Sequence, residues 1–349
     1  MKTARFLLLA VFACILFQSP AKSQDITQIG RDRYGTEPIE VTAEVSPDNK
    51  IYINSALGLS GSLVIRAHDT DRAAFKYKKL LKVGSKSEAV DYARVIEVKL
   101  ENTPQGARLM LQAPNPAPWS ETDNSGMLEG ELQLPSGSML EIDAVYFDLD
   151  IKGPFRAVEN HSSFGRIAVQ GITESVNLMT SNRDIMAQDI AGDITIATSH
   201  ADIRINNVNT GKQAAYIKNE NGNIILDNAE GAFDIKNDFG RIKIDDIRFN
   251  SDRSRLIGSY SLISVEIAEI NEGSLTIRNT NEDIYMSVPK SISADFSLRV
   301  DSNGEINTED FNVRPTLVDN DRLDFISGDA TAKIRASIRG NGNIKVQGF

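Results

Sequence analysis

The stretch GDITIATSHADIRINNVN, which runs from Gly192 to Asn209, contains one short phrase twice: Asp-Ile-Thr-Ile, and nine residues later Asp-Ile-Arg-Ile. In both phrases isoleucine alternates with polar residues, which is typical of a strand with one buried face. Six mainly polar residues, ATSHAD, separate Ile196 from Ile203 and include several turn formers. The stretch therefore predicts two strands joined by a turn.

Two series of apolar anchors extend this phrase in both directions. The second-strand anchors recur every 18 or 21 residues and are Ile167, Ile185, Ile203, Ile224, Ile242, Ile263 and Ile284. The first-strand anchors each precede one of these by seven residues and are Leu178, Ile196, Ile217, Ile235, Leu256 and Ile277. The return from a second-strand anchor to the next first-strand anchor takes 11 or 14 residues. One turn, here called the short turn, is therefore fixed in length, and only the opposite turn varies.

A two-strand unit repeated at this period is typical of a solenoid, in which each coil buries its apolar face against its neighbours. We expect an all-β β-solenoid with two short strands per 18–21-residue coil and about seven coils between Gly153 and Pro289. The alternative is an antiparallel meander folded as a sandwich, because short strands about ten residues apart fit that architecture too. The solenoid is favoured because equivalent apolar residues recur every second strand, as the stacking of two-strand coils requires.

The flanking regions are less regular, and we expect four parts: a signal peptide (1–23), an N-terminal β-rich module (24–152), the solenoid repeats (153–289) and C-terminal coils with a cap (290–349). Residues 85–95, SKSEAVDYARV, predict one short helix that Ser85 can cap. Within the N-terminal module the predicted strands are 39–45, 50–53, 62–68, 73–77, 96–100, 107–112, 127–134 and 139–142. A Pro-rich loop spans 113–126.

The N-terminus has the pattern of a secretory signal peptide. Lys2 and Arg5 precede an apolar run from Phe6 to Phe17, too short to span a membrane, and we place cleavage after Ser23. Cys14, the only cysteine, lies inside that run with Phe12 where a lipoprotein signal needs a small residue, so lipid anchoring there is not favoured. The mature chain then has no disulfide and no thiolate site.

The net charge of −10 becomes −13 after cleavage, because residues 1–23 carry three basic and no acidic side chains. A protein this acidic is not expected to bind nucleic acid or anionic lipid through general electrostatics. The strongest basic cluster, Lys76-Tyr77-Lys78-Lys79, is interpreted as a solvated strand or turn edge.

Candidate chemistry is sparse. His68, His161 and His200 lack metal-ligand spacing and are interpreted as surface turn residues; His200 occupies a turn position that other coils fill with Asn, Phe or Tyr. Asp184, Asp202 and Asp283 each precede a second-strand anchor and are candidates for one acidic column, although the other coils have no acid there.

Glycosidases need two carboxylates close together, so this column is the basis of an enzymatic alternative. No calcium-binding repeat or EF-hand loop is present. Trp119, the only tryptophan, lies in the Pro-rich loop, and a role in fixing that loop is favoured over ligand binding.

Three segments carry a resemblance to a family: SALGLSGSLVIRAHDTDRAAFKYKK (55–79), SKSEAVDYARVIEVKLENTPQGARLMLQAP (85–114) and LEGELQLPSGSMLEIDAVYFDLDIKG (128–153). Together with the repeated phrases and the signal they resemble a bacterial adhesin-like domain family of unknown function, consisting of secreted β-solenoid repeat proteins. The segment VYFDLDIKG (145–153) differs from the small Gly-Asp-Ile turn that members of that family more often have at this point. The resemblance implies a β-solenoid in or outside the cell envelope, and it transfers no binding residues.

The sequence thus favours a non-catalytic, secreted or periplasmic β-solenoid of the cell envelope that binds or presents a surface, with a cell-surface glycan or an envelope protein as partner. One alternative is a polysaccharide lyase or hydrolase on a β-helix, and another is a structural or stress-associated envelope component. We predict no catalytic residue, cofactor or metal site and no membrane span after cleavage. The ligand-binding residues are left undefined.

Overall fold

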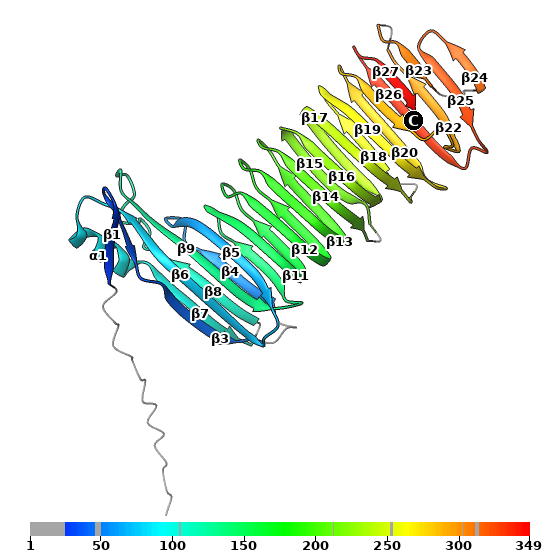
Figure 1. Cartoon of the computed structure of the whole chain (residues 1–349). Coiled ribbons are helices and arrows are strands. Elements are labelled where there is room, and N and C mark those ends of the chain that lie inside the picture. Colours follow the sequence, from blue (N-terminus) through cyan, green and yellow to red (C-terminus); the bar gives the residue numbers. More distant parts are fainter. Residues whose placement is uncertain are drawn as a thin grey trace, which may run out of the picture.

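A computed structural model describes residues 25–45, 50–104, 106–211, 213–251, 254–301, 303–310 and 314–349. The proposed signal peptide and Cys14 lie outside these residues. Within them the chain forms a long stack of strands that cross the molecular axis, with helix α1 (Lys86–Val95) at the N-terminal end (Figure 1). The all-β prediction is confirmed, and so is the helix, whose N-cap Ser85 accepts a hydrogen bond from the Glu88 backbone N–H.

The strands are β1 (Ile26–Gly30), β2 (Arg33–Thr36), β3 (Ile39–Glu44), β4 (Lys50–Ser55), β5 (Ser60–His68), β6 (Arg72–Lys82), β7 (Glu97–Thr103), β8 (Gly106–Gln112), β9 (Ser125–Pro135), β10 (Met139–Asp143), β11 (Phe147–His161), β12 (Ile167–Met179), β13 (Ile185–Thr198), β14 (Ile203–Thr210), β15 (Ala215–Asn221), β16 (Ile224–Gly231), β17 (Phe233–Phe249), β18 (Ser254–Gly258), β19 (Ser261–Ile270), β20 (Ser274–Thr280), β21 (Ile284–Val288), β22 (Ala294–Arg299), β23 (Ile306–Glu309), β24 (Arg314–Asp319), β25 (Arg322–Ser327), β26 (Ala332–Arg339) and β27 (Ile344–Gly348).

The two anchor series form two parallel ladders. Each second-strand anchor lies directly opposite the next, from Ile167 to Ile284. The first-strand anchors do the same from Leu178 to Ile277. Every anchor is at most 1% exposed, so both ladders line one continuous core. Because these pairings are parallel, the antiparallel meander is excluded for this part of the chain.

Both ends of the stack contain a coil that is out of sequence order. Near the N-terminus, β5 pairs with β9 on one side and β11 on the other, while β4 lies between β8 and β10. Near the C-terminus, β26 lies between β20 and β22, and β27 lies between β21 and β23. Antiparallel strands then cover the ends: β6 pairs with β9 and β3 with β6 at one end, and β25 pairs with β22 and β24 with β25 at the other. Such coverage hides strand edges that would otherwise pair with another chain.

The constant length of the short turn has a structural cause. Two residues after five of the six first-strand anchors a small polar side chain is buried in the short turn, and after Leu256 this position is Gly258; the five are Thr180, Thr198, Asn219, Asn237 and Asn279. Each donates a hydrogen bond to a carbonyl of the preceding coil's short turn, as when Asn219 Nδ2 reaches the Ala201 oxygen at 2.7 Å. A change in turn length would move these donors away from their acceptors.

At the opposite corner five of the six returns begin with a bend inside a strand, and β12 and β13 continue through it to the next first-strand anchor. The three 14-residue returns also contain the turn expected from the sequence, between β14 and β15, between β17 and β18, and between β19 and β20. Four residues after successive second-strand anchors the backbone has positive φ, at Gly171, Asp189, Asn207, Asn228 and Asp246. Asn207 Nδ2 donates to Asp189 Oδ1 at 2.6 Å, and this hydrogen bond, followed by one from Gln170, lowers the pKa of Asp189. The extra residue of this bulge returns the next side chain to the core, at Ile172, Ile190, Val208, Ala229 and Ile247.

The interpretation of Lys76–Lys79 as a solvated cluster is wrong for Lys79. That residue lies on β6 with its side chain under α1 and is only 3% exposed. Its Nζ donates to the Ala93 carbonyl at 2.7 Å, close to the C-terminal end of the helix. Burial lowers the pKa of Lys79 from 10.5 to about 8.

The lowered pKa of Lys79 predicts an unusual pH dependence of stability. Between pH 8 and 10.5 the unfolded chain binds a proton at this lysine that the folded chain does not bind. The free energy of unfolding should therefore rise with pH, by up to about 1.4 kcal/mol per unit, until the raised pKa of Tyr77 opposes the trend near pH 10. Urea unfolding at pH 8 and about pH 9.5 measures this rise, and Lys79→Met should remove it. If the free energy of unfolding rose equally with pH in the wild type and in Lys79→Met, the rise would not come from Lys79.

Candidate functional site

The three aspartates singled out from the sequence lie in one column along the short-turn edge. Each accepts a hydrogen bond from the backbone N–H of the equivalent residue in the next coil: Asp184 from Asp202 at 3.0 Å, Asp202 from Asn223 at 2.9 Å, and Asp283 from Asn343 at 2.7 Å. Asp184 and Asp202 belong to adjacent coils, whereas Asp283 lies several coils further along. These carboxylates therefore join successive short turns to one another.

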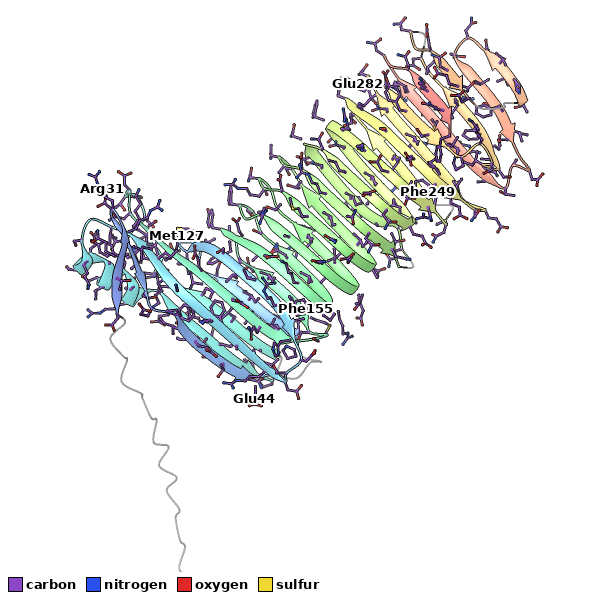
Figure 2. The ribbon with its side chains drawn as sticks, in the orientation of Figure 1. Arg31, Glu44, Met127, Phe155, Phe249 and Glu282 are labelled. Atoms are coloured by element: carbon purple, nitrogen blue, oxygen red, sulfur yellow. The ribbon has the colours of Figure 1, made fainter. Side chains whose placement is uncertain are left out.

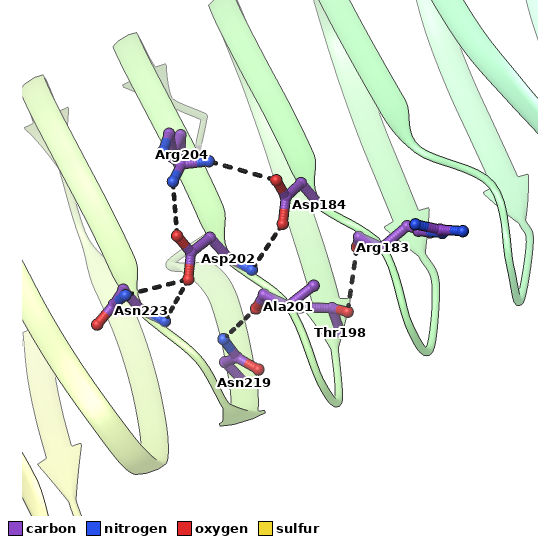
Figure 3. A network of polar contacts seen from close by, with 8 residues as sticks. All are labelled: Arg183, Asp184, Thr198, Ala201, Asp202, Arg204, Asn219 and Asn223. Atoms are coloured by element: carbon purple, nitrogen blue, oxygen red, sulfur yellow. Dashed lines mark hydrogen bonds and ion pairs between the residues drawn. The ribbon is translucent and has the colours of Figure 1, made fainter.

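Arg204 connects the two adjacent aspartates (Figure 3). Its guanidinium lies 3.5 Å from Asp184 Oδ2 and 2.6 Å from Asp202 Oδ2. The second oxygen of each carboxylate is taken by backbone N–H groups, and Asp202 also accepts from the side chain of Asn223. All four carboxylate oxygens of this aspartate pair thus contact Arg204 or accept hydrogen bonds within the fold. This favours a structural role for the pair over general acid–base catalysis.

A row of exposed side chains follows the same edge, three residues before successive second-strand anchors and before Leu149, which lies opposite Ile167. We call this row the turn ridge; it consists of Tyr146, Phe164, Asn182, His200, Asn221, Phe239 and Tyr260. Tyr146 and Phe164 stack with ring centroids 5.1 Å apart and planes within 8°, and Phe239 and Tyr260 stack at 5.6 Å and 6°. The four rings are 41–53% exposed. Ring stacking of this kind fixes exposed aromatic side chains in a defined orientation.

The middle of the turn ridge is polar, and its side chains also contact the neighbouring coil. Asn182, His200 and Asn221 each contact a carbonyl of the preceding coil through a side-chain nitrogen, at 3.3–3.4 Å from the oxygens of Ser163, Ser181 and Ser199 respectively. Together with the aspartates they line a depression of about 590 Å³ on this edge. In Figure 2 this edge is marked by Met127 and Glu282, opposite the edge that carries Phe155 and Phe249.

The other sequence candidates lie away from this depression. His68 and His161 are exposed, and His161 Nε2 lies 3.2 Å from Glu159. Trp119 is buried and donates to the Gly58 carbonyl at 2.7 Å, which confirms that it fixes the Pro-rich loop. Among the described residues no cluster of three or more His, Cys, Asp or Glu could hold a metal ion.

Sequence reasoning assigned His200 to the correct turn column but missed the aromatic pairs. The signal was present for Phe164, Phe239 and Tyr260, which all stand three residues before an anchor. Tyr146 could not be found in this way, because Leu149 was not among the anchors read from the sequence.

A comparison with known protein families identifies the family of this chain. The family model described as Toastrack DUF4097 matches residues 49–254, more than half of the chain. No curated protein matches.

Three solved structures are similar, and all three have adhesion-related names. A "putative cell adhesion protein" from Clostridium sporogenes is 11% identical, with 90% of this chain and 100% of that chain covered and a TM-score of 0.19. A "putative adhesin" from Parabacteroides merdae is 9% identical, with 89% and 96% covered and a TM-score of 0.27. A "putative adhesin" from Bacteroides fragilis is 13% identical, with 89% and 97% covered and a TM-score of 0.21.

The family match confirms the resemblance to a bacterial domain family of unknown function that the repeated phrases and the three N-terminal segments indicated. The chain belongs to the Toastrack DUF4097 family.

Proposed function

We propose that this protein is an exported, non-catalytic binding protein of the cell envelope, and that the turn ridge is its contact surface. The observation that carries the proposal is the turn ridge itself: exposed aromatic and amide side chains repeat in register along one edge of a rigid stack. Solenoids typically use such extended faces for binding. Exposed aromatic side chains are enriched in binding surfaces because they offer large contact area with little loss of conformational entropy.

Binding is favoured over catalysis because Asp184 and Asp202 are fully engaged with Arg204 and backbone amides.

Among the described residues no helix is long and apolar enough to cross a membrane.

Export is tested by expressing the full chain in a bacterium and analysing the periplasmic fraction. We expect a processed protein whose N-terminus is Gln24, which peptide mass analysis of the purified chain identifies. The variant Leu8→Arg, which interrupts the apolar run, should leave an unprocessed chain in the cytoplasm. Processing of both proteins alike would contradict the signal-peptide assignment.

The contact surface is tested with a variant that removes the four ridge rings, Tyr146→Ala, Phe164→Ala, Phe239→Ala and Tyr260→Ala. Labelled mature protein is applied to envelope preparations and the retained fraction is measured. The ridge variant should lose retention, whereas the control Met186→Ala with Tyr285→Ala, which alters exposed side chains of a strand face, should keep it. Equal retention of ridge variant and wild type would remove the turn ridge as the contact surface.

A further inference from the structure

The depression in the middle of the turn ridge presents a row of hydrogen-bond acceptors. The side chains of Asn182 and Asn221 use Nδ2, and His200 uses Nδ1, to contact the preceding coil. Asn182 Oδ1, Asn221 Oδ1 and His200 Nε2 are therefore the atoms left for a ligand. With Nδ1 as the donor, the neutral imidazole has its acceptor lone pair on Nε2. Successive coils place these three acceptors at intervals of roughly 4.8 Å.

Aromatic rings close the two ends of this row. Phe164 precedes Asn182 by one coil, and Phe239 follows Asn221 by one coil, so four coil steps separate them by roughly 19 Å. Each ring stacks on a partner on its outer side, Tyr146 behind Phe164 and Tyr260 behind Phe239. The other face of each ring is turned along the ridge toward the acceptor row, and the depression itself is lined by the polar residues between the two rings.

The charges around the depression balance. Three carboxylates, those of Asp148, Asp184 and Asp202, stand against three guanidiniums, those of Arg166, Arg183 and Arg204. Arg204 is held by the two aspartates, whereas Figure 3 shows Arg183 directed away from them. Arg183 and Arg166 are exposed and can donate hydrogen bonds at the side of the acceptor row.

This combination matches one ligand chemistry. Hydroxyl groups can donate to the acceptor row and accept from the two arginines, and the apolar faces of pyranose rings can lie on Phe164 and Phe239. A polyanionic ligand is disfavoured by electrostatics. Its oxygens would face three hydrogen-bond acceptors, the local charges offer no net positive charge, and the mature chain has a net charge of −13.

We propose that the depression between Phe164 and Phe239 is a binding site for an uncharged oligosaccharide that lies along the solenoid axis. This inference rests on the proposed role of the turn ridge as a contact surface and specifies its ligand.

The test applies mature wild-type protein to an array of immobilised neutral glucans, mannans and galactans, with polygalacturonate and heparin as acidic glycans, and then measures Kd for the tightest binder by titration calorimetry. We expect a neutral glycan to bind with a Kd that is unchanged between about 50 mM and about 500 mM NaCl, because no ion pair is formed. Phe164→Ala with Phe239→Ala should weaken binding about tenfold or more.

His200 supplies the matched pair of variants. His200→Ala should weaken binding about fivefold through loss of one acceptor. His200→Asn should bind like wild type, because asparagine fills the same column in the neighbouring coils and can donate to the Ser181 carbonyl while presenting Oδ1. If His200 only joined the short turns through the Ser181 carbonyl, His200→Ala would lower the free energy of unfolding in urea and leave Kd at the wild-type value. Circular dichroism verifies that both remain folded.

Two outcomes overturn the inference. One is salt-sensitive binding of an acidic glycan, and the other is an array without any glycan bound through the depression. If retention on envelope preparations still depends on the four ridge rings in either case, the proposed function stands and only the ligand class fails.

Discussion

Replacing Ile224 with alanine is expected to lower the free energy of unfolding by about 2–5 kcal/mol. Ile224 is fully buried and lies opposite Ile203 in one neighbouring coil and Ile242 in the other. Alanine would leave a cavity between two coils, and close packing on both sides prevents the stack from collapsing into it. Urea denaturation followed by circular dichroism measures the loss.

Ile225 provides the control, because it is the next residue on β16 and faces outward. Ile225→Ala should cost less than about 1 kcal/mol, since its side chain already contacts solvent. Comparable losses in the two variants would mean that the alternation of inward and outward residues does not describe this strand.

A second large effect is expected for Asn279→Ala, a loss of about 2–3 kcal/mol. Asn279 is 3% exposed, and its Nδ2 donates to the carbonyls of Ser261 at 2.8 Å and Glu282 at 2.9 Å. Its Oδ1 accepts from the Thr280 backbone N–H at 2.9 Å. Alanine would leave these backbone groups without a partner in the interior of the short turn, and water could not replace the lost side chain without opening the turn.

Asn182→Ala is the matched control for Asn279→Ala. Asn182 is exposed on the turn ridge and makes one hydrogen bond, at 3.4 Å, to Ser163. Its loss should change the free energy of unfolding by no more than about 0.5 kcal/mol. If the two variants unfold alike, the buried polar column is not what fixes the length of the short turn.

The repeat region could be predicted residue by residue because spacing and burial are linked. In a parallel stack like residues lie opposite each other, so the constant offset between Ile196 and Ile203 specified both ladders. The position of His200 among ridge residues followed from the same alignment. Helix α1 was predictable from Ser85 and the apolar pattern after it.

The features that could not be predicted depend on contacts between distant parts of the chain. Periodicity does not reveal that β5 inserts between β9 and β11, since each of these strands presents the same alternating pattern. Lys79 appeared solvated because its burial depends on α1 packing over β6. The ion pairs of Arg204 with Asp184 and Asp202 depend on how these side chains are oriented across two coils. Residue spacing does not specify that orientation.

Hydrogen–deuterium exchange tests most directly whether function resides on the turn ridge. Mature wild-type protein is compared with and without the neutral glycan that binds tightest on the array, and protection is mapped by peptide. The account predicts protection in the short turns around residues 164–166, 182–184, 200–202, 221–223 and 239–241. Protection confined to the outward strand faces, to the N-terminal module or to the opposite corner would contradict it.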